Sequence, residues 1–356
     1  GDVRIEFYAT VRTPEPFLPA GTVIAREQNY IYTFHKDNAA LQAAAPVKET
    51  ETQAIYSGKN FKAVFDKKSG MLVSYKYNGM EYILSGQGLH PNFWRAPIDN
   101  DYGAGLPHKL GVWKEVSYGE VTAAVFNARN GEVTCSYKFP KADASWDITY
   151  KIYADGVIKV NNRFVAANEK TPMIPRIGLR MQMPETFTTL TYYGRGPEEN
   201  YRDRRTSQFF GEYSLPIKDM YEPYIRPQEN NHRTDIYWCA FTNKSGAGLL
   251  LVADRTFELN ASNHPLETLD SGDDLHNAAP RTAETDHRHL TDPKPEKVVD
   301  VFVDYRMMGI GGDNSWGALP HEPYLIRTGS GNAIEYGFTL VPFGRKVDFR
   351  NLIYQY

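Results

Sequence analysis

This sequence of 356 residues has little cysteine, no long apolar run and no large excess of either charge. Two cysteines, Cys135 and Cys239, are too few for a disulfide framework. Both lie in strand-like stretches, so we expect buried free thiols. No apolar run approaches the roughly 18 residues that a membrane-spanning helix needs. The formal net charge of −3 gives no electrostatic footprint for nucleic acid or an anionic membrane.

A signal peptide and an initiator methionine are also absent. The chain begins at Gly1 and enters strand-like sequence at once, so we expect a truncated or processed chain. These features leave the compartment open between cytoplasm and periplasm.

Aromatic residues are abundant, with 24 Tyr and 18 Phe, and such side chains favour strands and also line sugar sites. Long amphipathic helical patterns are absent. Strict alternation places Trp146, Ile148 and Tyr150 on one face of a strand. The pair Asn78-Gly79 predicts a type I′ hairpin. The sequence therefore predicts an all-β chain with two large packed sheets.

The pattern changes character along the chain. Residues 3–12 and 29–35 are predicted to be strands. An Ala- and charge-rich stretch without an apolar face follows. We therefore expect residues 1–36 to be the tail of a preceding domain, residues 37–54 to be a linker, and residues 55–356 to form one large β domain.

Four segments resemble the C-terminal, small-chain region of family 2 β-galactosidases. They are FWRAPIDNDYG (93–103), YYGRGPEENYRDRR (192–205), YIRPQENNHR (224–233) and MMGIGGDNSWG (307–317). They occur in the family's order and cover most of residues 55–356. The stretch 262–290 departs from the pattern because it is longer than the family's usual connection.

This resemblance implies a β-supersandwich of the galactose mutarotase-like type, preceded by a remnant of an immunoglobulin-like sandwich. The family's general acid and nucleophile lie in an upstream barrel, so we expect no catalytic residue in this chain. The intact enzyme would hydrolyse terminal β-D-galactosides with retention. No cofactor is expected in this region, and a divalent cation is plausible in the barrel. The expected partners are the barrel and immunoglobulin-like domains, of the same enzyme or of a large subunit, and homo-oligomers are possible.

The glycine-rich segment GIGGDNSWG follows a strand but precedes no helix, and Asp313 would repel phosphate, so a phosphate loop is disfavoured. A tight loop that presents Trp316 is the better interpretation. From the residues alone, Trp316 could be buried or functional. The resemblance implies that it lines the aglycone side of the pocket, and we expect Trp316, Asp313 and Asn314 to bind substrate.

Several acids could suggest a glycosidase pair, which needs two carboxyl groups roughly 5 Å apart. Glu198, Glu199, Asp203 and Glu229 have no spacing that demonstrates such a pair, and hydrogen bonding in turns beside arginines is favoured.

Other groups could bind metal. Asp99, Asn100 and Asp101 could hold Ca²⁺ or Mg²⁺. Anchoring of the loop is favoured for them, and Arg95 should pair with one of the acids. His287 and His289 lack further spaced ligands.

Two other functional classes stay open. One is a stand-alone carbohydrate-binding module. The other is an aldose 1-epimerase, which would need a histidine such as His232 as an acid or base.

Overall fold

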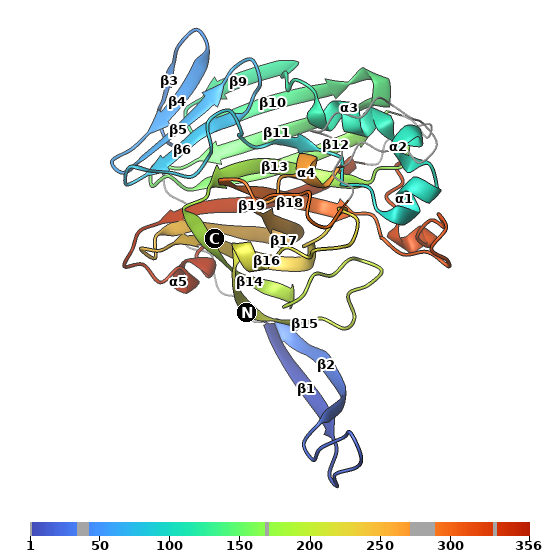
Figure 1. Ribbon diagram of the computed structural model, residues 1–356. Helices are drawn as coiled ribbons and strands as arrows, with labels where there is room; N and C mark the ends of the chain where they lie inside the picture. The colour runs from blue at the N-terminus through green and yellow to red at the C-terminus, as the bar shows by residue number, and fades with distance from the viewer. Residues whose placement is uncertain (1, 34–42, 168–170, 271–288, 330–332) are drawn as a thin grey trace. The chain divides into compact units, whose positions relative to one another are not determined.

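The computed structural model describes residues 2–33, 43–167, 171–270, 289–329 and 333–356. The chain divides into two compact units, residues 1–40 with 354–356, and residues 41–353. Antiparallel strands make up most of both units (Figure 1). Within the described residues, no helix is long and apolar enough to cross a membrane.

The first unit is an antiparallel hairpin of β1 (Asp2–Thr10) and β2 (Val23–Thr33). The strands predicted at 3–12 and 29–35 are both present, but β2 begins earlier. The reason is that the β-branched residues from Val23 onward continue the pairing to the far end of β1.

Within its described residues, the second unit contains two antiparallel sheets. The smaller has five strands in sequence order: β3 (Val47–Glu49), β4 (Gln53–Ser57), β5 (Phe61–Asp66), β6 (Leu72–Tyr77) and β7 (Met80–Glu81). The larger has twelve strands, nine of them along the path β15-β14-β16-β17-β19-β12-β11-β10-β9, with β13, β18 and β8 joined to it off that path. Their bounds are β8 (His90–Asn92), β9 (Val125–Arg129), β10 (Glu132–Phe139), β11 (Ala144–Ile152), β12 (Ile158–Ala166), β13 (Arg176–Pro184), β14 (Phe187–Gly196), β15 (Phe209–Pro216), β16 (Arg233–Asn243), β17 (Gly248–Ser262), β18 (Val298–Met307) and β19 (Ala333–Phe343).

The strands follow the alternation in the sequence. In β11, Trp146, Ile148 and Tyr150 are fully buried, while the residues between them are partly exposed. Asn78 and Gly79 have φ values of 49° and 79°, as the predicted hairpin turn between β6 and β7 requires. The expected all-β architecture is therefore confirmed, but of the two packed sheets only one is large, with twelve strands against five.

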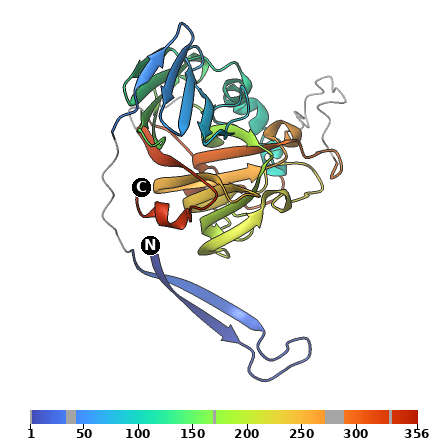
Figure 2. The same ribbon diagram turned by 90° about the vertical axis from the view of Figure 1, so that its left-hand side faces the viewer.

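Aromatic side chains fill the space between the two sheets. The rings of Phe65 in β5 and Tyr150 in β11 meet edge to face with centroids 4.9 Å apart. The Tyr82 hydroxyl donates to the carbonyl of Gly248 at 2.9 Å. Figure 2 shows the small sheet lying against the end of the large one that carries β9 to β11. Truncating one such buried ring would cost about 3–5 kcal/mol.

Part of the expected linker is strand. Residues 37–42 lie outside the described residues, but the rest of the 37–54 stretch contains β3 and the start of β4. Ala45 and Ala54 are fully buried. The Ala-rich composition hides this strand pairing because small buried residues leave no visible alternation. The assignment of residues 1–36 to a preceding immunoglobulin-like domain stays a prediction.

Helices are short and serve as connections. The α-helices are α1 (Asp99–Gly103), α2 (Leu106–Lys109), α3 (Gly111–Tyr118), α4 (Leu266–Leu269) and α5 (Arg350–Ile353), and the 3-10 helices are η1 (Pro140–Ala142), η2 (Ile217–Asp219) and η3 (Glu322–Tyr324). The sequence pattern did not predict α1 to α3. Of these, α3 is anchored to the core by its Trp113, whose ring centroid lies 4.8 Å from that of Phe93.

Candidate functional site

The four segments that resemble the β-galactosidase small chain converge in the second unit. All four contribute to a pocket of about 540 Å³, here called the loop pocket. Its lining consists of Arg204, Tyr224, Gln228, Glu229 and residues 98–100 and 310–315. Segments far apart in the sequence thus build one site, and hydrogen bonds between them fix its shape.

Arg95 joins the first and fourth segments. Its buried guanidinium donates to both carboxylate oxygens of Asp101 at 2.8 and 3.0 Å. It also donates to the carbonyls of Met308 and Gly309 at 2.7 and 3.1 Å. The predicted pairing of Arg95 with an acid of the 99–101 turn is therefore confirmed. Because Asp101 is engaged in this way, the arrangement favours loop anchoring.

Asp203 holds the start of the glycine-rich loop. Its carboxylate accepts the backbone N–H groups of Ile310 at 3.1 Å and Gly311 at 2.6 Å. A Cβ at Gly309 would lie 2.6 Å from an Asp203 carboxylate oxygen, so a larger residue there would displace the carboxylate. A phosphate loop is disfavoured because an aspartate of the same protein already accepts these N–H groups.

The tip of the loop presents Trp316 to solvent. The side-chain oxygen of Asn314 accepts a hydrogen bond from the backbone N–H of Trp316 at 2.8 Å. The side-chain amide of Asn100 donates to the backbone carbonyl of Asn314 at 3.0 Å. Gly317 has φ +102°, and a Cβ there would lie 2.3 Å from the carbonyl carbon of Gly103. Trp316 itself is 86% exposed. Within this chain it is therefore no core residue, and its contact with substrate stays a prediction.

Asp313 and Asn314 line the loop pocket. The Asp313 carboxylate is exposed and lies 2.8 Å from the Nε2 atom of His321. Asn314 is committed to the backbone of its own loop. Substrate binding by either residue stays a prediction.

Glu199 is buried at the junction of the second and third segments. It accepts the Asn231 N–H at 2.6 Å, an Arg204 guanidinium N–H at 2.8 Å and the Tyr224 hydroxyl. Burial, together with the hydrogen bond to Glu199, raises the pKa of Tyr224 to about 12. Glu199 is thus a structural acceptor, as favoured from the sequence.

Glu229 and His232 belong to one buried network. Glu229 accepts the Ala96 N–H at 3.2 Å and the Asn260 amide at 3.0 Å. The His232 ring is fully buried, with Nδ1 2.7 Å from the Asn260 oxygen and Nε2 2.9 Å from a Glu258 oxygen. A ring held at both nitrogens and closed to solvent favours a structural role for His232.

The remaining candidates are scattered. Glu198 is exposed. His287 lies outside the described residues, and the exposed His289 contacts Asp292. Among the described residues, no three His, Cys, Asp or Glu side chains are grouped so that they could hold a metal ion. Cys135 and Cys239 are buried free thiols, as expected.

Sequence reasoning missed how the site is held together. It treated Asp203 as one acid among arginines and did not find its partner loop. It also passed over Tyr224 and Gln228, which line the loop pocket. The sequence indicated Tyr224 and Gln228 only by their position in a segment that resembles the family, because the residues beside them in the pocket come from other segments.

Comparison with known proteins decides the family. Residues 57–340 match the family described as beta galactosidase small chain. The chain belongs to this family. It is 34% identical over 313 residues to a beta-galactosidase of Priestia megaterium, covering 86% of this chain and 28% of that protein. It is 28% identical over 346 residues to one of Streptococcus thermophilus, covering 95% of this chain and 31% of that protein. The small-chain region described here thus spans under a third of these relatives.

Solved structures with a similar fold include a galactose mutarotase related enzyme from Lactobacillus acidophilus. Its TM-score is 0.48 at 10% identity, and the match covers 82% of the small-chain region's sequence and 98% of that protein. A putative aldose 1-epimerase from Escherichia coli K12 has a TM-score of 0.46 at 10% identity, covering 81% and 98%. TM-scores at this level carry no argument about this chain.

Proposed function

We propose that this chain is the small-chain region of an enzyme that hydrolyses terminal β-D-galactosides with retention. The observation that carries the proposal is the family match over residues 57–340, together with the convergence of all four family segments on the loop pocket. The curated relatives bear the name beta-galactosidase over proteins about three times longer. The partner in this proposal is therefore a barrel-containing region, on the same chain or on a large subunit.

In this proposal the chain supplies no catalytic carboxylate. A retaining glycosidase needs two carboxyl groups about 5 Å apart that flank an open substrate site. Glu199 and Glu229, the buried acids of the site, are instead committed to hydrogen bonds that join chain segments. The acid, the nucleophile and any divalent cation would belong to the barrel.

The role proposed for the loop is to complete the aglycone side of the active site. The supporting observation is a large indole, 86% exposed, on a loop anchored by Arg95, Asp203 and Asn100. A flat, rigid ring complements the apolar C–H face of a pyranose, and fixed loops lose little entropy on binding. Trp316, with Asp313 and Asn314 beside it, would contact the leaving sugar.

The test uses a chromogenic β-galactoside. The purified 356-residue chain should give no hydrolysis, because an acid and a nucleophile must act together. A chimera that carries this chain in place of the matching region of the Priestia megaterium enzyme should hydrolyse the substrate. Turnover by the isolated chain that disappears on Glu199→Gln or Glu229→Gln would refute the proposal. A folded but inactive chimera would also count against it.

A further inference from the structure

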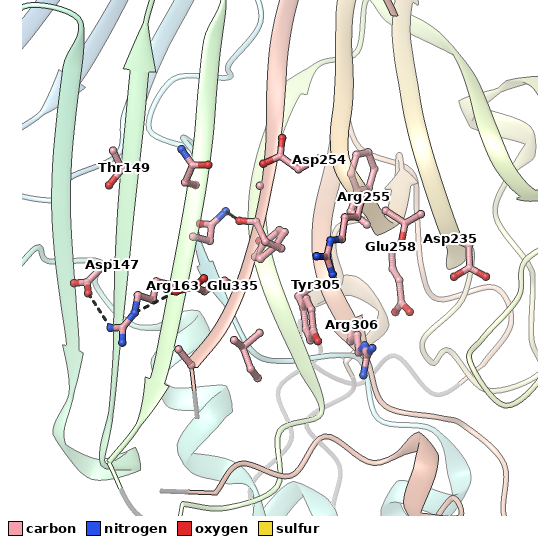
Figure 3. Close-up of a pocket in the computed structure, with 18 of the residues that line it drawn as sticks. Asp147, Thr149, Arg163, Asp235, Asp254, Arg255, Glu258, Tyr305, Arg306 and Glu335 are labelled. Carbon is pink, nitrogen blue, oxygen red and sulfur yellow. Dashed lines mark hydrogen bonds and ion pairs between the residues drawn. The ribbon is translucent and has the colours of Figure 1, made fainter. Parts of the chain in front are cut away.

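A second cavity of the second unit, larger than the loop pocket, is a groove on the large sheet. It has a volume of about 1050 Å³ and shares no lining residue with the loop pocket. Side chains from β11, β12, β17, β18 and β19 line it, together with Arg202, Arg205 and Asp235 (Figure 3). A cavity of this size accommodates a drug-sized ligand or a short oligosaccharide.

The groove opens where β17 changes partners. β17 pairs with β19 as far as Ala253, and with β18 from Glu258 onward. The other neighbour of β17 is β16. Val252 pairs with Trp238 and Phe257 with Ile236, so five residue steps along β17 lie opposite only two along β16. The extra residues form a bulge that carries Asp254 and Arg255 into the groove. Bulges of this kind re-aim side chains and are often found at functional sites.

The carboxylates of the groove already have cationic partners. Asp147 and Glu335 lie 3.9 and 3.4 Å from the guanidinium of Arg163. The other three pairs are Glu258–Arg202 at 3.6 Å, Asp235–Arg205 at 2.8 Å and Asp254–Lys159 at 3.1 Å. The negative charge of the lining is therefore compensated within the protein.

Two arginines of the groove have no such compensation. In the part of the chain that the structure describes, neither Arg255 nor Arg306 has a carboxylate at ion-pair distance. Both are exposed, and Figure 3 shows them on the wall formed by β17 and β18, with Tyr305 on the same wall. Their guanidinium groups keep donors free for a ligand.

The positive charge is concentrated further by Arg202. Burial lowers the pKa of Arg202, and repulsion from Arg306 and Arg205 lowers this pKa further. Its only paired carboxylate among the described residues is Glu258, at 3.6 Å. A bound anion would reduce the repulsion among these arginines.

The rest of the lining suits a sugar. Tyr305 is half-buried, with the Arg306 guanidinium 4.8 Å from its ring centroid and the ring of Tyr336 6.1 Å away. Asn161, Thr149 and Thr256 add amide and hydroxyl groups that can bond to sugar hydroxyls. An aromatic face next to planar polar groups is the usual composition of a site for pyranose rings.

We propose that this groove binds an oligosaccharide that carries an anionic group, with Arg255 and Arg306 holding the anion and Tyr305 contacting the sugar ring. The anionic group is a carboxylate, as in a uronic acid, or a sulfate ester, since both match the donors of guanidinium. The proposal does not depend on the function proposed for the loop pocket.

Calorimetric titration of the full 356-residue chain tests it with three probes: a galacturonic acid trisaccharide, a sulfated galactose disaccharide and a neutral galactose trisaccharide. At least one anionic probe should bind, and more weakly as salt rises. The neutral probe should bind at least about tenfold more weakly, because it lacks the charge-assisted hydrogen bonds. Which anionic probe binds identifies the acid group.

The variants Arg255→Gln and Arg306→Gln should each lower the affinity for the anionic probe about tenfold, and the double variant should show no measurable binding. Arg129→Gln is the matched control, since Arg129 is an exposed arginine on β9 that does not line the groove. All variants should melt near the parent temperature. Equal binding of neutral and anionic probes, no binding of either anion, or an equal loss in Arg129→Gln would overturn the proposal.

Discussion

Replacing Asp203 with alanine should loosen the glycine-rich loop without unfolding the domain. Asp203 accepts the N–H groups of Ile310 and Gly311 at 3.1 and 2.6 Å. Alanine leaves both donors without their acceptor. A hydrogen bond to a charged partner contributes about 1.5–3 kcal/mol when it is buried.

The half-buried position of Asp203 reduces this magnitude. The side chain also lines an open pocket of about 260 Å³, where water can replace the lost acceptor. We therefore expect about 1 kcal/mol for each bond, or a loss of about 2 kcal/mol of unfolding free energy. The amides of Ile310 and Gly311 should exchange with solvent about 30-fold faster, as 2 kcal/mol implies.

Urea unfolding and hydrogen exchange measured residue by residue check both numbers. The matched control is Asp313→Ala, because Asp313 is on the same loop, its side chain is 83% exposed, and its one ion-pair partner among the described residues is the exposed His321. That change should stay within about 0.5 kcal/mol. Unchanged exchange of the two amides in Asp203→Ala, or an equal effect of Asp313→Ala, would show that Asp203 does not anchor the loop.

Three further predictions concern the fold. Gly317→Ala should cost about 2–4 kcal/mol, since φ is +102° and the new Cβ would lie 2.3 Å from a backbone atom. Gly246→Ala, at φ +80° and with only an ordinary 3.5 Å contact to the Arg345 carbonyl oxygen, should cost about 1–2 kcal/mol, and equal losses in urea melts would contradict this difference. Iodoacetamide at pH 8 should label neither Cys135 nor Cys239 before unfolding, because burial raises the pKa of Cys135 to about 12 and that of Cys239 well above its usual value. Rapid labelling of the native chain would contradict the burial of these thiols. Burial lowers the pKa of His90 below its unfolded value of about 6.5, so the folded state favours the neutral ring and the unfolding free energy should fall as pH drops from 7 to 5. The fall should be smaller in His90→Gln, and an equal dependence of the unfolding free energy on pH in both proteins would contradict this.

Local patterns predicted the strands of the second unit well. Trp146 and Tyr150 alternate with polar residues, and Asn78-Gly79 can form only a small set of turns, so these features depend on neighbours in sequence. The partner change of β17 near Ala253 could not be foreseen, because it depends on β18 and β19, which lie far from β17 in the sequence.

In the candidate site, too, contacts between sequence neighbours could be predicted and contacts between distant segments could not. Resemblance located Trp316, and the pairing of Arg95 with a nearby acid followed from their closeness in sequence. The bonds from Asp203 to Ile310, and from Glu199 to Asn231, join residues 107 and 32 positions apart, and nothing local indicates them. Such contacts follow from the topology of the sheet, which residue spacing does not reveal.

The proposal that the loop completes an aglycone site is tested most directly by acceptor kinetics in the chimera with the Priestia megaterium enzyme. Trp316→Ala is compared with Val125→Ala, which removes a half-exposed apolar side chain on β9. An aromatic contact worth about 1–2 kcal/mol predicts that binding of a glucose acceptor weakens about 5- to 30-fold in Trp316→Ala. Galactosylation of the enzyme from an activated substrate, and the melting temperature, should change little. Unchanged acceptor binding with a large loss of stability in Trp316→Ala, or the same loss of acceptor binding in Val125→Ala, would contradict the account.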